Sequence, residues 1–173
     1  MGRWKPDSRG RLHEAALALY SERGFDQTTA AQIAEQAGLT ERTFFRYFAD
    51  KREVLFGGSA LLQERIVAGG LDAAAAMLGE GRRDLTRQRY EVIAANPELR
   101  ERELAKLADY AAAVAAALRQ RGVSPSQATL AAEAGMTLLR IAVQRWAGEE
   151  DDRDLASIMR AAVAELRDVA SGN

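Results

Sequence analysis

The side chains best suited to chemistry lie close together between residues 29 and 51. They are hydroxyl and cationic groups, namely Thr29, Thr40, Arg42, Thr43, Arg46, Tyr47 and Lys51. An arginine fork can hold a guanine edge or a phosphate, and a threonine methyl can contact the methyl group of thymine. These residue types therefore suit contact with a DNA duplex, with Arg42 and Arg46 on guanines or phosphates and Thr43 on a thymine methyl.

Two short helices must position these side chains. Thr29 and Gln32 have capping-box spacing, which opens the first helix, and Gly38 ends it with a tight turn. Thr40 then caps a second helix over residues 41–47. The residues expected to pack inward are Ile33, Ala34, Leu39, Phe44 and Phe48. This packing would leave the hydroxyl and cationic side chains on the outside, where a recognition helix needs them.

Residues 29–51 resemble the helix-turn-helix of the TetR family of transcriptional regulators. The resemblance includes the threonine cap, the alanine-glycine-leucine turn and the aromatic-x-tyrosine-phenylalanine ending. It implies that Thr29, Tyr47 and Lys51 contact phosphates. It also implies a ligand-released repressor that binds a palindromic operator in double-stranded DNA as a homodimer. In this family the C-terminal domain binds a small-molecule effector and dimerises through its last two helices.

Helical periodicity continues through the rest of the chain, and no run alternates apolar and polar residues as a strand does. We therefore expect an all-α fold of about nine helices. A three-helix head with the helix-turn-helix would occupy residues 1–52, and an effector-binding and dimerisation domain would occupy residues 53–173. The last two helices are expected over about 125–147 and 152–170, on either side of an acidic turn.

Three local patterns set further helix boundaries. An apolar stripe from Leu12 to Tyr20 predicts a first helix that stops at Gly24. Asp50 to Glu53 is a capping-box pattern that predicts the start of a longer helix. Gly57 and Gly58 would soften that helix, or Gly58 would admit close packing.

Candidate effector contacts are spread along the C-terminal part. Thr137 and Arg140 belong to a polar stripe that faces either solvent or a cavity, where Arg140 would favour an anion. Arg89 presents the same two alternatives. The apolar candidates, which are core residues in the alternative interpretation, are Met77, Tyr90, Ile93, Tyr110, Met136 and Trp146. Residues 43–48 with 96–100 also resemble the mycofactocin-associated TetR subgroup, which implies an acyl-type effector.

Composition narrows the function classes. The net charge is −1, with +2 on residues 1–52 and −3 on the remainder. Arg3, Lys5, Arg9 and Arg11 would form a flexible basic arm that contacts the DNA backbone or the adjacent minor groove. There is no cysteine and one histidine, His13, so we expect no metal site, no cofactor and no enzyme activity.

The polar, basic first eleven residues and the absence of a long apolar stretch predict a cytoplasmic protein without a membrane span. The alternative function is a helical dimerisation or adaptor protein whose head does not read DNA. The small positive charge of the head and Glu41 on the second short helix keep this alternative open.

Overall fold

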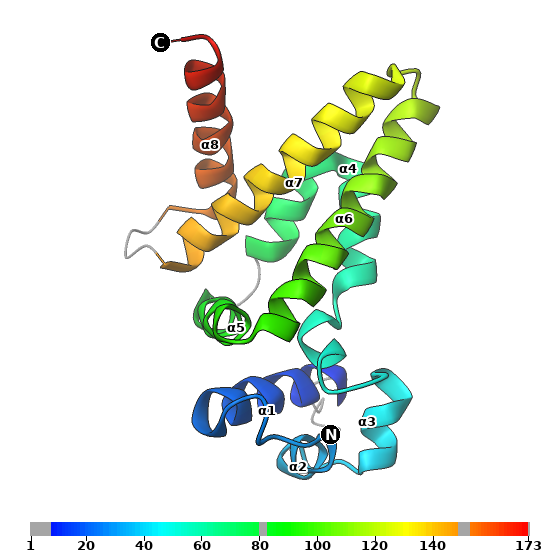
Figure 1. Cartoon of the computed structure of the whole chain (residues 1–173), viewed down its shortest axis with the longest axis vertical. Helices are drawn as coiled ribbons and strands as arrows, with labels where there is room; N and C mark the ends of the chain where they lie inside the picture. The colour runs from blue at the N-terminus through cyan, green and yellow to red at the C-terminus, as the bar shows by residue number, and fades with distance from the viewer. Residues whose placement is uncertain (1–7, 80–82, 149–152, 173) are drawn as a thin grey trace, which may run out of the picture. The chain divides into compact units, whose positions relative to one another are not determined.

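The computed structural model describes residues 8–79, 83–148 and 153–172, and their regular structure is entirely helical. The elements are α1 (Ser8–Arg23), α2 (Ala30–Gln36), α3 (Glu41–Tyr47), the 3₁₀ turn η1 (Glu53–Phe56), α4 (Ser59–Gly79), α5 (Arg83–Ala95), α6 (Pro97–Gln120), α7 (Pro125–Gly148) and α8 (Leu155–Ala170) (Figure 1). The all-α expectation is confirmed. The expected acidic turn at 149–152 lies outside the described residues, as do Arg3 and Lys5.

Two compact units make up the chain. The first combines Met1–Gly58 with Gln88–Glu103, and the second combines Ser59–Arg87 with Leu104–Asn173. We expected the head to end at residue 52. The first unit instead extends through η1 and takes in the ends of α5 and α6, because side chains from residues 88–103 hold the segment that follows α3.

In the first unit, α1 supplies one wall of the core. Its apolar stripe is buried, with Leu12 fully enclosed and Tyr20 only 4% exposed. The helix ends at Gly24, whose φ of +85° is a conformation that glycine adopts without steric cost. Phe25 then folds back, and its ring meets the Tyr20 ring edge-on at 5.2 Å. α2 packs against α1, and α3 packs against α2 (Figure 1).

The longer helix expected from Asp50 does not begin there. Oδ1 of Asp50 accepts hydrogen bonds from the backbone N–H groups of Arg52 and Glu53 at 2.8 and 3.1 Å. The Glu53 side chain is hydrogen-bonded to Arg102 of α6. The segment forms the short 3₁₀ turn η1, and α4 starts later, at Ser59.

Gly57 and Gly58 lie between η1 and α4, so the chain is interrupted at the two glycines that were expected to soften a continuous helix. The close approach lies at Gly57 rather than at Gly58. A Cβ added at Gly57 would lie 2.9 Å from the Phe48 ring, whereas nothing lies within 4 Å of a Cβ at Gly58. Gly57 therefore admits the Phe48 ring, and the expectation for Gly58 is corrected by one residue.

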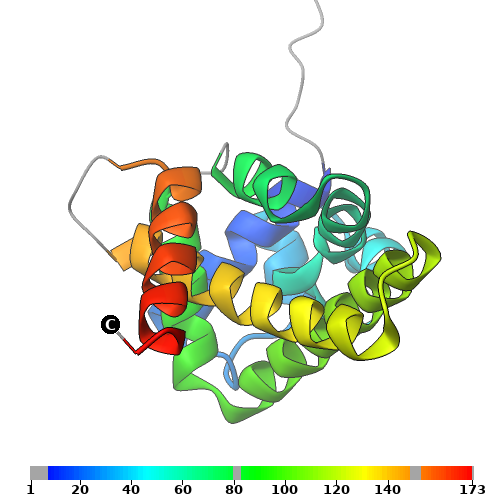
Figure 2. The ribbon, with the colours of Figure 1, turned by 90° about the horizontal axis from the view of Figure 1, so that it is seen from above.

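The second unit is built on α4, α7 and α8, which pack on one another. Figure 2 shows α7 and α8 from above. α4 is kinked at Gly70, where φ is +72°. In α7, Gly135 is buried with Leu71 close to it, and a Cβ there would lie 3.3 Å from the leucine methyl. The prolines at 97 and 125 are the first residues of α6 and α7, as predicted.

Among the described helices, none combines the length and apolar character that a membrane crossing requires.

Candidate nucleic-acid interface

The α2–turn–α3 segment is held at both helix starts by threonine caps. Oγ1 of Thr29 accepts from the N–H of Gln32 at 3.2 Å, and the Gln32 side chain accepts from the N–H of Thr29 at 2.9 Å. Thr40 caps α3 by accepting from the N–H of Thr43 at 3.2 Å. Gly38, at φ +64°, makes the turn between the helices. The predicted capping box and the predicted turn are both confirmed.

The inward face of the segment is apolar, as expected. Phe44 is completely enclosed and Phe48 is 4% exposed, and their ring centroids lie 5.5 Å apart. Ile33 and Ala34 of α2 are also buried, while Leu39 is half-buried. These contacts fix which side of α3 faces away from the unit.

The side of α3 turned away from this core carries the candidate contact residues. Arg42, Arg46 and Thr40 are exposed, and Thr43 and Tyr47 are half-buried. The Arg46 guanidinium donates to the Tyr47 hydroxyl at 3.1 Å and lies 4.8 Å from the centre of its ring. This contact holds a cation and a phenol side by side, which is suited to a phosphate or a base edge.

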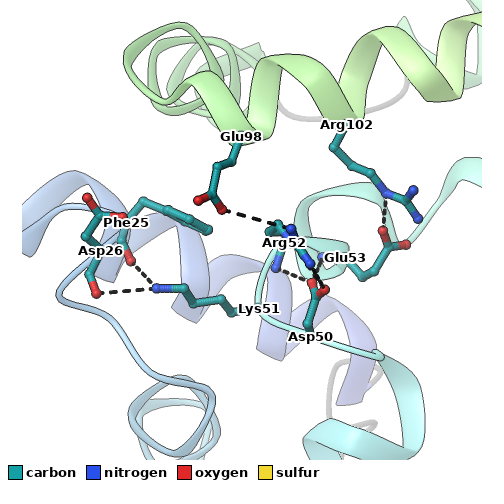
Figure 3. A network of polar contacts seen from close by, with 8 residues as sticks. All are labelled: Phe25, Asp26, Asp50, Lys51, Arg52, Glu53, Glu98 and Arg102. Carbon is teal, nitrogen blue, oxygen red and sulfur yellow. Dashed lines mark hydrogen bonds and ion pairs between the residues drawn. The ribbon is translucent and has the colours of Figure 1, made fainter.

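Lys51 is used differently from the expectation. Its Nζ donates to the backbone carbonyls of Phe25 and Asp26 at 2.8 and 3.4 Å (Figure 3). It also donates to the carbonyl of Thr28 at 3.0 Å and lies 4.2 Å from the centre of the Phe25 ring. An ammonium group has three N–H donors, so three carbonyls occupy all of them. The structure therefore makes Lys51 a brace for the segment that leads into the Thr29 cap, rather than a free donor for phosphate.

Two members of the expected basic arm belong to α1. The Arg11 guanidinium donates to the carbonyls of Ala37 and Gly38, the latter at 3.3 Å, and so supports the turn before α3. The Arg9 guanidinium lies 5.7 Å from the centre of the Phe48 ring. The arm interpretation is therefore corrected for both arginines, since α1 extends further toward the N-terminus than the sequence suggested.

A charged network joins the segment after α3 to the start of α6 (Figure 3). The Arg52 guanidinium donates to Asp50 at 2.7 Å and lies 4.0 Å from Glu98. Arg102 is hydrogen-bonded to Glu53. Partial burial raises the pKa of Asp50, but hydrogen bonds from Arg52 and from two backbone N–H groups outweigh it, so the pKa lies below its ordinary value.

Arg89 makes a second connection within the same unit. Its guanidinium donates to the Leu55 carbonyl at 3.0 Å and to Glu103 at 3.2 Å. It also lies 5.1 Å from the centre of the Phe56 ring. Arg89, one of the candidate effector residues, is thus engaged by η1 and α6.

His13 lies against η1. Its Nδ1 donates to the Val54 carbonyl at 3.0 Å. Burial lowers the pKa of His13 below its ordinary value, and the hydrogen bond to Val54 opposes that shift only in part. His13 is therefore a neutral packing residue. Among the described residues, no group of three His, Asp or Glu side chains is placed to hold a metal ion.

The other effector candidates are divided between the two units. Tyr90 and Ile93 belong with Arg89 to the first unit, and the remaining six belong to the second. Of those six, Tyr110, Met136 and Trp146 are buried, Met77 is half-buried, and Thr137 is exposed. Arg140 is half-buried and lies 3.5 Å from Gln144 of the same helix. Their role in binding an effector stays a prediction.

Two features of the interface were missed by the sequence analysis. Phe45 is 53% exposed, although it directly follows the fully enclosed Phe44. Its position three residues after Arg42 was the available signal, because residues at that spacing share a helix face. The pairing of Glu53 with Arg102 had no local signal, since 49 residues separate the two.

Comparison with known proteins relates both parts of the chain to regulators. The profile described as "Bacterial regulatory proteins, tetR family" matches residues 12–56, and that described as "MftR C-terminal domain" matches residues 66–171. The transcriptional regulator TcmR of Streptomyces glaucescens is 39% identical over 61 residues, which are 35% of this chain and 27% of TcmR. The repressor KstR2 of Mycobacterium tuberculosis is 40% identical over 47 residues, which are 27% of this chain and 24% of KstR2.

These matches to curated relatives thus span only about a quarter of each relative's length. A solved structure is similar over much more of the chain. It is the TetR family repressor FadR of Thermus thermophilus in complex with lauroyl-CoA. The two chains are 29% identical, with a TM-score of 0.53, and the similarity covers 92% of this chain and 93% of FadR.

Proposed function

We propose that this chain is a ligand-released repressor of transcription. It belongs to the TetR family of bacterial regulatory proteins and has an MftR-type C-terminal domain. One observation of the site supports this function above the others. α3 buries Phe44 and Phe48 while Arg42 and Arg46 stay exposed on the same short helix. A recognition helix needs this division in order to enter a major groove.

In the proposed complex, Arg42 and Arg46 contact guanine edges or phosphates. Thr29, Thr40, Thr43 and Tyr47 are the further DNA contacts, with Thr29 and Tyr47 on phosphates. Lys51 contributes by bracing the segment before α2, because its donors are already engaged. The net charge of this region is small, so affinity depends on where its cations lie more than on their number.

We infer a homodimer formed through α7 and α8. Large apolar side chains are exposed on both helices, with Leu130 at 72%, Leu166 at 47% and Val169 at 76%. Burial of such surface between copies is the usual source of dimer stability. A dimer would present two α3 helices to half-sites about one helical turn, roughly 34–36 Å, apart. Sedimentation of a Leu166→Glu, Val169→Glu variant should show monomer, whereas Leu104→Glu on α6 should stay dimeric.

The proposed effector is an acyl thioester of coenzyme A. The support is the 29% identity to the FadR structure, whose ligand is lauroyl-CoA, together with the MftR-type C-terminal match. An effector releases DNA only if it binds more tightly to the conformation that fits the operator poorly. Lauroyl-CoA should therefore raise the unfolding temperature and lower affinity for DNA, whereas free coenzyme A and laurate, tested separately, should do less.

A genomic-fragment selection with the purified protein tests DNA recognition. The wild type should enrich a palindromic sequence at low salt, and an Arg42→Ala, Arg46→Ala variant should not. Arg65→Ala, Arg100→Ala is the matched control, because it removes the same charge from exposed positions outside α3. Failure of the wild type to enrich any sequence, with and without lauroyl-CoA, would favour the alternative of an adaptor whose head does not read DNA.

A further inference from the structure

Phe45 is an apolar ring on the outward part of α3 that the core does not use. It is 53% exposed, in contrast to the fully enclosed Phe44 beside it and to Phe48 at 4%. Exposure of this part of the phenyl ring to water is unfavourable in proportion to the apolar area exposed. A single exposed apolar side chain is common on protein surfaces, so exposure alone does not assign Phe45 a partner. What distinguishes Phe45 is its place on α3, the helix proposed to enter the major groove, beside the exposed Arg42 and Arg46.

The ring is held in a defined orientation before any ligand arrives. The rings of Phe45 and Phe44 meet edge-on, with centroids 5.3 Å apart and planes at 83°. Phe44 is itself fixed by the core, so it orients its neighbour. Phe45 also follows Arg42 by three residues, which places the two side chains next to each other along the helix surface.

Building on the proposed function, we propose that Phe45 is a specificity-determining residue that contacts the C5-methyl group of a thymine in the major groove. The ring has no hydrogen-bond donor or acceptor with which to read a polar base edge. Thymine alone presents an apolar methyl group in that groove. Phe45 therefore selects a thymine beside the base or phosphate held by Arg42.

Thr43 is the other residue on α3 that was considered for a methyl contact. It is half-buried, and its hydroxyl lies 2.9 Å from the Thr40 hydroxyl while its N–H donates to the same threonine. These bonds hold the hydroxyl and the backbone of Thr43 at the start of α3. The greater exposure of Phe45 and its lack of polar contacts make its ring the better partner for a methyl group.

The test removes the methyl groups without changing the base pairing. Random-sequence duplexes are first selected on the wild-type protein, and each thymine of the enriched sequence is then replaced singly by deoxyuridine. At one thymine in each half-site the replacement should weaken binding about fourfold, which corresponds to one apolar carbon group left without its contact. Replacement at the other thymines should change affinity by less.

Three variants assign the effect to a residue. Phe45→Ala should bind the thymine and deoxyuridine duplexes equally at that position, whereas Phe45→Tyr, which keeps the ring, should still prefer thymine. Thr43→Ser removes the competing methyl group. Because Thr43 is itself a proposed DNA contact, the overall affinity of this variant is compared separately, and only the ratio of thymine to deoxyuridine affinity at that position should match the wild type. Because Phe45 is about half exposed, alanine removes little buried surface besides its edge contact with Phe44, and thermal unfolding of each variant checks the fold.

Each outcome decides the inference. A thymine preference that is present in the wild type and Phe45→Tyr but lost in Phe45→Ala would support it. A preference that persists in Phe45→Ala, or is missing at every thymine in the wild type, would overturn it while the proposed function stands. If the wild type enriches no duplex at all, the proposed function and this inference fail together.

Discussion

Nζ of Lys51 donates a hydrogen bond to the backbone carbonyl of Phe25, 26 residues earlier in the chain, at 2.8 Å. With the further bonds to Asp26 and Thr28, it closes the segment between α1 and the Thr29 cap of α2. A lysine placed directly after α3 therefore stabilises the start of the other helix of the pair. Its effect on DNA binding should be through the fold of the head.

Substitution of Lys51 by methionine tests this role. We expect the free energy of unfolding to fall by about 1–3 kcal/mol, because carbonyls lose charge-assisted hydrogen bonds. Urea unfolding measures that change. The slope of log affinity for the selected duplex against log salt should stay the same, and a decrease of about one would show instead that Lys51 contacts a phosphate. Lys51→Arg provides the charge-retaining comparison.

The pairing of Glu53 with Arg102 should be energetically coupled. In a double-mutant cycle with Glu53→Gln and Arg102→Gln, we expect a coupling energy of about 0.5–1 kcal/mol, because both side chains are partly open to solvent. The Arg145–Glu165 pair, more exposed overall, is the control and should show less. Equal coupling energies in the two pairs would contradict the view that side chains from residues 88–103 hold the segment that follows α3.

The stability of the protein should depend on the protonation of His13. Burial keeps its pKa below the ordinary value of 6.5, so the unfolded chain takes up this proton first as the pH falls. Stability from this group is therefore present above about pH 6.5 and is lost progressively below it. The chain has one histidine, so the comparison with His13→Gln isolates the effect.

Thermal unfolding of both proteins at about pH 7.5 and about pH 5.5, on either side of the ordinary histidine pKa, measures this difference. The wild type should lose more stability than His13→Gln over that interval. An equal loss in the two proteins would mean that His13 does not have a lowered pKa.

Two glycine substitutions should have opposite effects on stability. Gly38 has a φ of +64°, and a Cβ there would lie 2.9 Å from the Arg11 guanidinium. Gly38→Ala should therefore lower the free energy of unfolding by about 1–2 kcal/mol. Gly10 lies in α1 with nothing within 4 Å of an added Cβ, so Gly10→Ala should stabilise by up to about 1 kcal/mol. Urea unfolding of both variants decides the signs.

Local chemistry made much of the fold predictable from the sequence. The Thr29–Gln32 box, the turn at Gly38 and the helix starts at Pro97 and Pro125 each depend on a few neighbouring residues. The inward packing of Phe44 and Phe48 followed from helical spacing for the same reason. Each of these features is decided within one or two turns of the chain.

The features that were not predicted depend on residues far apart in the sequence. The Asp50 pattern looked like the start of a long helix, but only a 3₁₀ turn follows it, and the Glu53 side chain is hydrogen-bonded to Arg102, 49 residues later. The phosphate contact of Lys51 was implied by the family resemblance, and no local pattern marked the carbonyls that it contacts, since they lie more than twenty residues away in the chain. The exposure of Phe45 is the exception, because its position three residues after Arg42 was a local signal that the sequence analysis did not use.

The most direct test of the central claim is the salt dependence of binding to the selected duplex, measured by fluorescence anisotropy. For the wild type, log affinity should fall linearly with log salt, because arginine contacts release counterions from phosphates. The Arg42→Ala, Arg46→Ala variant should bind more weakly, with less discrimination between the selected and a scrambled duplex. Affinity that is unchanged by salt, or equal for the wild type and this variant, would contradict DNA recognition by α3.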